Sequence, residues 1–332
     1  ARDSILSLGI HDLMIQLIQS VNEILVNQGI PETTDFNPDT DLKSFLIFVS
    51  TCFQKVFSDL KDTDRQIIFD TIPQIINLLN IKIKEVQLEM ILILLSIVRT
   101  FPSTVFMIFS INSGEITDHI FTILQNLDGE TITEDLVIFT LKLLGNLCQS
   151  KPSDIAVLYS SGICNILSSL MINQRVTTEV LWVLSNLYEV ITDQMIAEIT
   201  PEFIHKLIGL ANSCDLNCKL EVGYFFSTII IFSPQSMTKN LIVEDIIDII
   251  VDIIACSQYN IANRAVNAIA RLVHFAQLTN EYQPLLSFLE ISDLKDRLRE
   301  LLDDDSLSVW LDNRISLSEF YTVIENLLTQ QK

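Results

Sequence analysis

Apolar residues along this chain recur at intervals of three and four, the spacing of one face of an α-helix. The pattern is clear in residues 4–28 and 65–79, where apolar positions fall at i, i+3, i+4 and i+7. Strand-like alternation is nearly absent. Only 8 Gly and 8 Pro occur among 332 residues, so few positions interrupt helices. The sequence therefore predicts an all-α protein.

One helical segment recurs along the chain. In Leu181-Trp182-Val183-Leu184-Ser185-Asn186, an indole and a carboxamide lie four residues apart, so both face the same side of a helix. We call such an i, i+4 couple a phased pair. Asn186 lies 40 residues after Asn146, steps of 42 and 43 lead on to Thr228 and Arg271, and a step of 50 leads back to Ser96. The phased pairs are Leu92–Ser96, Lys142–Asn146, Trp182–Asn186, Tyr224–Thr228 and Asn267–Arg271.

This spacing indicates a repeat protein. Units of about 40 to 47 residues, each filled with two or three helices, are typical of armadillo and HEAT solenoids. The longer step into Asn146 predicts a loop insertion around residues 126–134. No Gly/Ser-rich or Pro-rich linker divides the chain, and solenoid repeats bury their apolar faces against their neighbours. We therefore expect one continuous solenoid over residues 1–332.

The most apolar segments are predicted to be buried solenoid helices. Residues 224–232 end before Pro234 and are broken by Ser227 and Thr228. Residues 242–256 carry four acids spaced to line one helix face, namely Glu244, Asp245, Asp248 and Asp252. Both stretches fall short of the roughly 18 apolar residues that a membrane span needs. The first residues also lack the basic and apolar regions of a secretory signal.

The six cysteines mostly lie in apolar helical frames, which is typical of core thiols. Cys214 and Cys218, with His205 nearby, are conceivable metal ligands. That set lacks a fourth ligand and a zinc-type spacing, so we favour a structural turn and predict no metal or cofactor.

Charge narrows the class of partner. The chain has 21 Lys and Arg against 42 Asp and Glu, a formal net charge of −21. Such a charge repels phosphate backbones and anionic membranes, so we expect neither direct nucleic-acid binding nor membrane insertion. Basic protein partners are favoured, although acidity also serves solubility.

Acidic residues precede the phased pairs by three positions. Glu89 precedes Leu92, Glu179 precedes Trp182 and Glu221 precedes Tyr224. In two consecutive repeats a carboxylate therefore lies beside an aromatic ring on the same helix face. An extended basic peptide can lay its Lys and Arg stems on such rings, with about 0.5 to 2 kcal/mol for each ring. Asn186 would then hydrogen-bond the peptide backbone.

These motifs resemble those of the importin-α (karyopherin-α) family of armadillo-repeat proteins. Trp182-Val183-Leu184-Ser185-Asn186, with Glu179 ahead of it, looks like the family's third-helix motif. Lys142-Leu143-Leu144-Gly145-Asn146 resembles the repeat in which a basic residue replaces the tryptophan. Residues 306–321 are similar in pattern to the closing repeat. The resemblance covers residues 137–321.

The resemblance implies a right-handed superhelical solenoid of about seven to eight repeats. It also implies a nuclear import adaptor that shuttles between cytoplasm and nucleus and holds nuclear localisation signals in a concave groove. Importin-β and an export receptor are then expected partners. By the resemblance, the minor peptide site consists of Lys142, Asn146, Glu179, Trp182, Asn186, Glu221 and Tyr224, with Thr228 in place of the family's usual Asn.

The sequence also departs from the family. The family's major site needs Trp–Asn pairs in the N-terminal half, where this chain has Leu92 and Ser96, and its only tryptophans are Trp182 and Trp310. We therefore expect either that cargo binds mainly at the minor site or that the chain is a divergent relative with altered cargo. The Arg/Lys-rich importin-β-binding arm is not found in this chain.

Other interpretations stay open. Trp182 and Tyr224 are also residue types that pack in helical cores. Lys142 and Arg271 would either place positive charge in the groove or pair with acids of an adjacent repeat. An armadillo or HEAT scaffold that binds a folded partner without cargo transport is the alternative function, and a degenerate relative whose groove holds an internal segment is a third. No phosphate loop, His-Glu-x-x-His or nucleophile elbow occurs, so we predict no enzyme.

Overall fold

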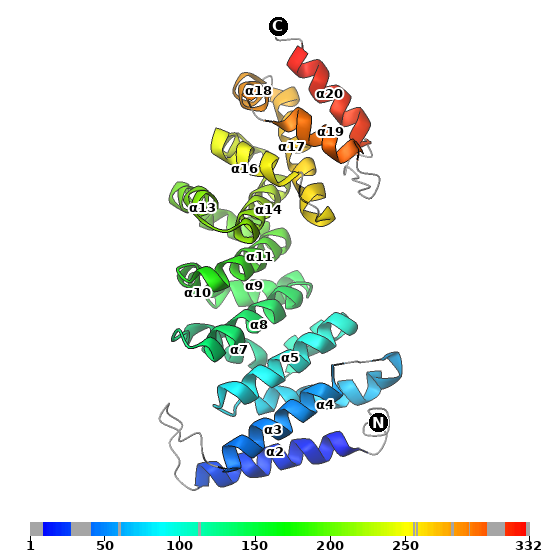
Figure 1. The fold of residues 1–332 in the computed structure, drawn as a ribbon, viewed down its shortest axis with the longest axis vertical. Helices are drawn as coiled ribbons and strands as arrows, with labels where there is room; N and C mark the ends of the chain where they lie inside the picture. The colour runs from blue at the N-terminus through cyan, green and yellow to red at the C-terminus, as the bar shows by residue number, and fades with distance from the viewer. Residues whose placement is uncertain are drawn as a thin grey trace. The chain divides into compact units, whose positions relative to one another are not determined.

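The computed structural model describes residues 9–27, 41–58, 61–111, 114–254, 256, 258–279, 282–291, 293–303 and 316–329. Within these ranges the regular elements are α-helices and short 3-10 helices, and no β-strand occurs (Figure 1). The predicted all-α class is therefore confirmed. Most of the segment that resembles a closing repeat, including Trp310, lies outside the described residues.

Long helices recur in the register predicted from the phased pairs. These are α3 (Asp41–Val56), α5 (Lys84–Thr100), α8 (Thr131–Leu147), α11 (Gln174–Val190), α14 (Leu216–Phe232) and α17 (Tyr259–Thr279). Their first residues follow one another at steps of 42 to 47. The longest step leads into α8, where residues 126–130 connect it to the preceding helix.

Other helices fill the intervals, two or three before each long helix after α3. In the N-terminal half they are α2 (Ile10–Asn27), η1 (Asp62–Asp64), α4 (Arg65–Leu78), α6 (Thr104–Ser110), α7 (Glu115–Gln125), α9 (Pro152–Ser160) and α10 (Ile163–Leu170). In the C-terminal half they are α12 (Thr192–Met195), η3 (Ile196–Glu198), α13 (Pro201–Ser213), α15 (Gln235–Thr238), η4 (Lys239–Leu241), α16 (Glu244–Ile254), α18 (Tyr282–Ile291) and α19 (Leu294–Asp303). The last described helix is α20 (Leu317–Thr329).

The chain divides into two compact units, residues 1–179 and residues 180–332. The division falls inside α11, between Glu179 and Val180. A single solenoid over residues 1–332 stays a prediction.

In the first unit, α5 packs against α3 and α8. Its buried face carries apolar residues at helical spacing, including Met90, Ile93 and Ile97. Polar side chains join successive repeats at the edges of this core. Ser96 Oγ donates to the carbonyl oxygen of Phe57 at 2.9 Å, and Thr51 Oγ1 donates to Glu89 Oε1 at 2.8 Å. The apolar stripe and these bonds fix the rotation of α5 in its repeat.

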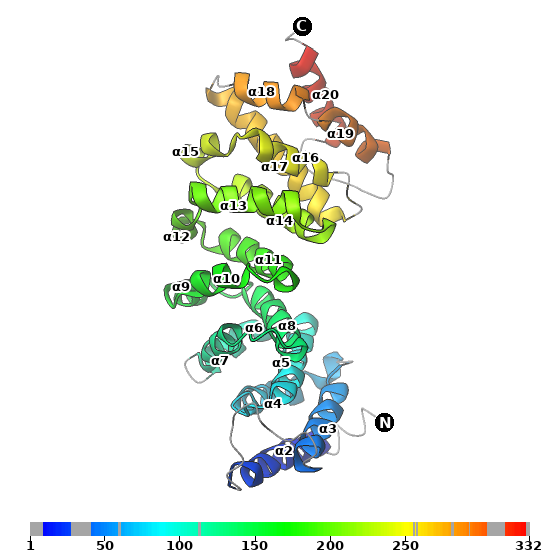
Figure 2. The same cartoon turned by 60° about the vertical axis from the view of Figure 1, so that its left-hand side comes forward.

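In the second unit, α14 is the central helix and packs against α13, α16 and α17 (Figure 2). Asp215 caps its first turn by accepting a hydrogen bond from the Cys218 backbone N–H at 2.9 Å. This cap sets where α14 begins and hence which residues face outward. Gly223 lets α16 approach, since a Cβ built there would lie 2.6 Å from Ile253 Cδ1. The predicted burial of the apolar run in α14 is confirmed.

Helix α16 has the two faces that its sequence predicts. Its isoleucines are buried, including Ile246, Ile250 and Ile253, whereas Glu244, Asp245, Asp248 and Asp252 are exposed. None of the described helices combines the length and the unbroken apolar stretch that a bilayer crossing requires.

Candidate peptide-binding site

The predicted site residues fall in both units. Lys142, Asn146 and Glu179 belong to the first unit, and all three are partly exposed. Lys142 Nζ lies 3.2 Å from Glu179 Oε1 and 5.3 Å from the centroid of the Phe139 ring. Asn146 Nδ2 donates to the carbonyl oxygen of Lys142 at 2.7 Å, within its own helix. The structure thus supports the interpretation in which Lys142 pairs with an acid of the next repeat.

On α11 of the second unit, Trp182 and Asn186 are both partly exposed. The residues between and beside them are buried, among them Leu181, Val183 and Leu187. Because side chains four residues apart share a helix face, this phased pair reaches the protein surface together. The alternative in which Trp182 is wholly sealed in the core does not hold.

On α14, Glu221 and Tyr224 are likewise partly exposed. Thr228, in contrast, is completely buried, and its hydroxyl donates to the carbonyl oxygen of Tyr224 at 2.9 Å. The prediction that Thr228 contacts a peptide is therefore wrong. The reason is packing. Neighbouring helices enclose α14, and a buried threonine can satisfy its hydroxyl by donating to a carbonyl oxygen of its own helix.

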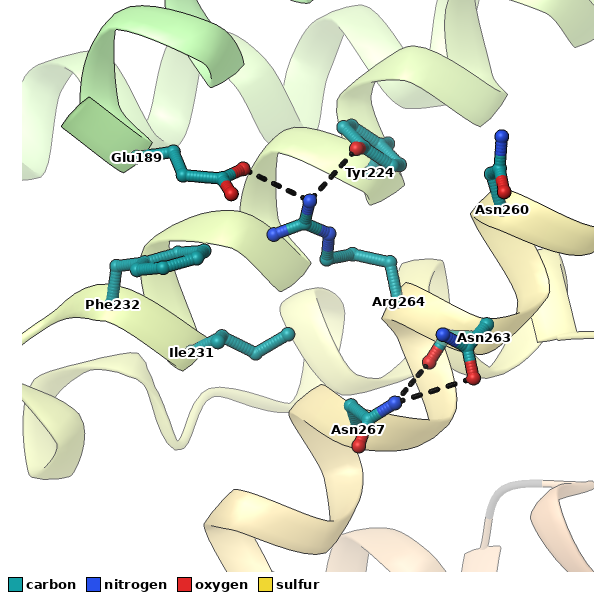
Figure 3. A pocket seen from close by; sticks show the side chains of 8 residues that line it. All are labelled: Glu189, Tyr224, Ile231, Phe232, Asn260, Asn263, Arg264 and Asn267. Atoms are coloured by element: carbon teal, nitrogen blue, oxygen red, sulfur yellow. Dashed lines mark hydrogen bonds and ion pairs between the residues drawn. The ribbon is translucent and has the colours of Figure 1, made fainter. Parts of the chain in front are cut away.

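A pocket of about 320 Å³ lies beside Tyr224 in the second unit. Helices α11, α14 and α17 supply its lining, which consists of Glu189, Tyr224, Ile231, Phe232, Asn260, Asn263, Arg264 and Asn267. Figure 3 shows the Arg264 side chain extending from α17 toward Tyr224 and Glu189. Its Nη2 donates to Glu189 Oε2 at 2.9 Å and to the Tyr224 hydroxyl at 3.0 Å.

Two aromatic rings complete the surroundings of this guanidinium. Its central carbon lies 5.1 Å from the centroid of Tyr224 and 5.4 Å from that of Phe232, within cation–π range of both. We call Glu189, Tyr224 and Phe232 the guanidinium box. It has the chemistry predicted for a ligand's basic side chain, namely an aromatic surface with a carboxylate, and in this structure it holds an arginine of the chain itself.

Sequence reasoning missed Glu189, Phe232 and Arg264. The repeat register contains a signal for the arginine, because Arg264 follows Glu221 by 43 residues and Glu221 follows Glu179 by 42. A basic residue thus replaces the repeated acid in α17. No comparable signal exists for Glu189 and Phe232, which lie near the carboxyl ends of their helices.

Arg271, the second cation of α17, has a structural role. Its Nη2 donates to the carbonyl oxygen of Ser233 at 2.7 Å. The hydroxyl of Ser233 in turn lies 2.7 Å from that of Tyr188, and both side chains are fully buried. Burial also raises the pKa of Tyr188. Arg271 thus contacts the preceding repeat rather than an acid.

The cysteine and histidine set stays outside this site. His205 Nδ1 lies 2.7 Å from the carbonyl oxygen of Pro201, and burial raises the pKa of Cys218 to about 12. A thiol that keeps its proton is a poor metal ligand. No group of three or more His, Cys, Asp or Glu side chains within the described ranges is arranged to hold a metal ion.

No family model and no curated protein matches this sequence. Among solved structures, a designed armadillo repeat protein is similar over 78% of this chain and 99% of its own, with a TM-score of 0.57 and 12% identity. Another, described as in complex with peptide (KR)4, covers 78% and 99%, with a TM-score of 0.55 and 13% identity. A computationally designed armadillo repeat protein for modular peptide recognition covers 78% and 98%, with a TM-score of 0.51 and 13% identity. At such identities the likeness shows the fold, which is that of an armadillo-repeat solenoid.

Proposed function

We propose that this chain is a non-enzymatic armadillo scaffold that binds extended peptides rich in lysine and arginine, chiefly through α11 and α14. The observation that carries the proposal is the occupied guanidinium box, where one cation contacts Tyr224, Phe232 and Glu189. A surface that accommodates an arginine of its own chain has the shape and charge to accommodate one from a ligand.

Three further observations support the proposal. Trp182 and Asn186 reach the surface together, so an aromatic ring and a carboxamide lie on the same exposed side of α11. The fold is also that of designed proteins made for peptide recognition, one of them solved with the peptide (KR)4. Finally, a net charge of −21 attracts cationic segments over a distance of about one Debye length.

The finer proposal is that these peptides are nuclear localisation signals and that the protein is an import adaptor. It rests on the resemblance of residues 137–321 to importin-α. On this proposal the protein shuttles between cytoplasm and nucleus, and importin-β and an export receptor are its carriers. Import of a fluorescent cargo bearing a basic signal, in permeabilised cells supplied with this protein and importin-β, tests that role.

The alternative is a scaffold for a folded partner, and the internal ion pairs favour it. Glu179 and Glu189, two acids that a basic peptide would use, already contact Lys142 and Arg264. If these pairs are permanent, the groove is closed to cations and the outer acidic faces become the better candidates for binding.

Titration of a labelled lysine- and arginine-rich peptide distinguishes the two functions. The double variant Trp182→Ala and Asn186→Ala should weaken binding at least about tenfold, since it removes one cation–π contact and one hydrogen bond. Wild-type binding should weaken as salt is added. Phe48→Ala is the matched control, because Phe48 is an exposed aromatic residue on α3. Unchanged affinity in a double variant that keeps its circular dichroism spectrum would eliminate the groove mechanism.

A further inference from the structure

The guanidinium box suits arginine better than lysine. A single nitrogen of Arg264, Nη2, donates both hydrogen bonds to the box. The two aromatic rings lie within 5.5 Å of the guanidinium carbon of the same arginine. A planar, delocalised guanidinium can stack on rings while it donates in its own plane. A lysine ammonium can also donate two hydrogen bonds from one nitrogen, but it is a compact and strongly hydrated charge that does not stack on the two rings as a planar guanidinium does.

The contacts that hold Arg264 in the box are limited. Its side chain is 20% exposed, and that of Glu189 is 42% exposed. Among the described residues, only Nη2 of its three nitrogens has a hydrogen-bond partner. Ion pairs between partly exposed side chains contribute little to stability. The adjoining pocket of about 320 Å³ gives a second side chain a route to the box.

The position of Arg264 indicates what it replaces. In the repeat register it occupies the place of Glu221 and Glu179, yet its side chain turns back toward α14 and α11 (Figure 3). The α17 repeat therefore contributes a cation to the surface where its two predecessors contribute acids. A ligand cation directed to Tyr224 meets this arginine first.

From these observations we infer that Glu189, Tyr224 and Phe232 form an arginine-selective subsite, which Arg264 occupies in the absence of ligand and must vacate for a ligand arginine. The inference rests on the proposed function, because it specifies which side chain of a bound peptide enters this part of the groove. Arg264 thereby lowers the affinity for every basic peptide and removes most of the preference for arginine.

The test compares two peptides that differ only in having arginine or lysine at their basic positions. In the wild type their affinities should lie within about threefold of each other, since Arg264 shields the box. In Arg264→Ala the arginine peptide should bind about tenfold more tightly than in the wild type, and the lysine peptide at most about threefold more tightly.

Arg299→Ala is the matched control. Arg299 lies 5.9 Å from the ring centroid of Tyr321 and donates to its hydroxyl at 2.9 Å, so the control removes an equivalent arginine–tyrosine contact and the same charge. It should leave the affinity ratio of the two peptides unchanged. Arg264→Lys keeps the net charge and should give a smaller gain for the arginine peptide than Arg264→Ala. Because Arg264→Ala also makes the net charge more negative, comparison with Arg264→Lys separates the effect of emptying the box from the effect of charge.

A small probe tests the box without a peptide. N-acetyl-arginine methylamide at millimolar concentration should raise the unfolding temperature of Arg264→Ala more than its lysine counterpart does, and it should not do so in the wild type. Equal effects of the two compounds, or an unchanged peptide ratio in a folded Arg264→Ala protein, would overturn the inference. If the box binds the arginine compound while the double variant Trp182→Ala and Asn186→Ala leaves peptide affinity unchanged, the proposed function fails and the arginine site remains.

Discussion

The two units carry the same repeat register but use its phased pairs differently. In the first unit, Ser96 donates to the backbone of the preceding repeat and Asn146 donates within its own helix. In the second unit, Trp182 and Tyr224 present aromatic rings at the surface. The register thus supplies equivalent positions along the chain, and the residue type decides whether a position joins repeats or is open to a ligand.

The acids beside the phased pairs show the same contrast. Glu179 contacts Lys142, a cation on the long helix of the preceding repeat. Glu189 contacts Arg264, which is 75 residues away and comes from the second long helix after its own. Only the second arrangement adds two aromatic rings and a pocket. On the proposed function, ligand selection therefore belongs to the second unit.

The largest difference in packing is at the residue that precedes the phased pair. Ile91, Leu141 and Leu181 fill that position in α5, α8 and α11 and are fully buried. In α14 it is Gly223, where a Cβ would lie 2.6 to 3.1 Å from three side-chain atoms of Ile253. Gly223→Leu, which installs the residue of α8 and α11, should lower the free energy of unfolding by about 3 kcal/mol. Urea unfolding measures it.

Gly209→Ala controls for the loss of a helical glycine. No atom lies within 4 Å of a Cβ added there, so this variant should be stabilised by about 0.5 to 1 kcal/mol. A Gly223→Leu protein as stable as the wild type would show that α14 and α16 are not in close contact.

The next difference lies two residues after the phased pair. The first unit has Val98 and Cys148 there, both buried, and α11 has Tyr188, whose hydroxyl is bonded to that of Ser233. Tyr188→Phe should destabilise the protein by about 1 to 2 kcal/mol, because it leaves the buried Ser233 hydroxyl without this partner. A double-mutant cycle with Ser233→Ala checks the origin of the effect. Additive losses in the cycle would mean that the hydrogen bond contributes nothing.

Much of the fold was predictable because it depends on periodicity. Apolar spacing identified the helices, and the phased pairs identified the register that α5, α11 and α14 follow. The partial exposure of Trp182 was predictable from its repeated neighbours. Thr228 was not, since its burial depends on the enclosure of α14 by other helices. Arg264 bonds across two long helices, and a helical register does not show in which direction a long side chain turns.

A smaller effect on binding is expected at the internal ion pair of the first unit. Lys142→Ala exposes Glu179 to ligands, but it opens no aromatic box, so the affinity for a basic peptide should rise by no more than about threefold. Lys43→Ala is the control, because it removes an equivalent pair with Glu85 at 3.3 Å in the same unit. A rise of tenfold or more for Lys142→Ala would move the main site into the first unit.

The smallest predicted effects concern two aspartates, one in each unit, whose pKa values are shifted in opposite directions. The hydrogen bond from Lys84 lowers the pKa of Asp128 to about 2. Asp128 therefore stabilises the folded protein above its ordinary pKa of 3.8, and this stabilisation is lost as the pH falls toward 2. Partial burial, with the nearby charges of Glu244 and Asp252, raises the pKa of Asp248. Its ionised form is therefore a cost to the folded state at neutral pH.

The two substitutions should consequently change stability in opposite directions. At pH 7, Asp128→Asn should lower the free energy of unfolding and Asp248→Asn should raise it, each by at most about 1 kcal/mol because both side chains are exposed. The change in the free energy of unfolding caused by each substitution should shrink as the pH falls. The change caused by Asp248→Asn should shrink first, since the native protein protonates Asp248 at a higher pH than Asp128. Urea unfolding at pH 7, 4 and 2.5 measures the order. If both substitutions changed the stability in the same direction at pH 7, the acids of α16 would not destabilise the ionised form of Asp248.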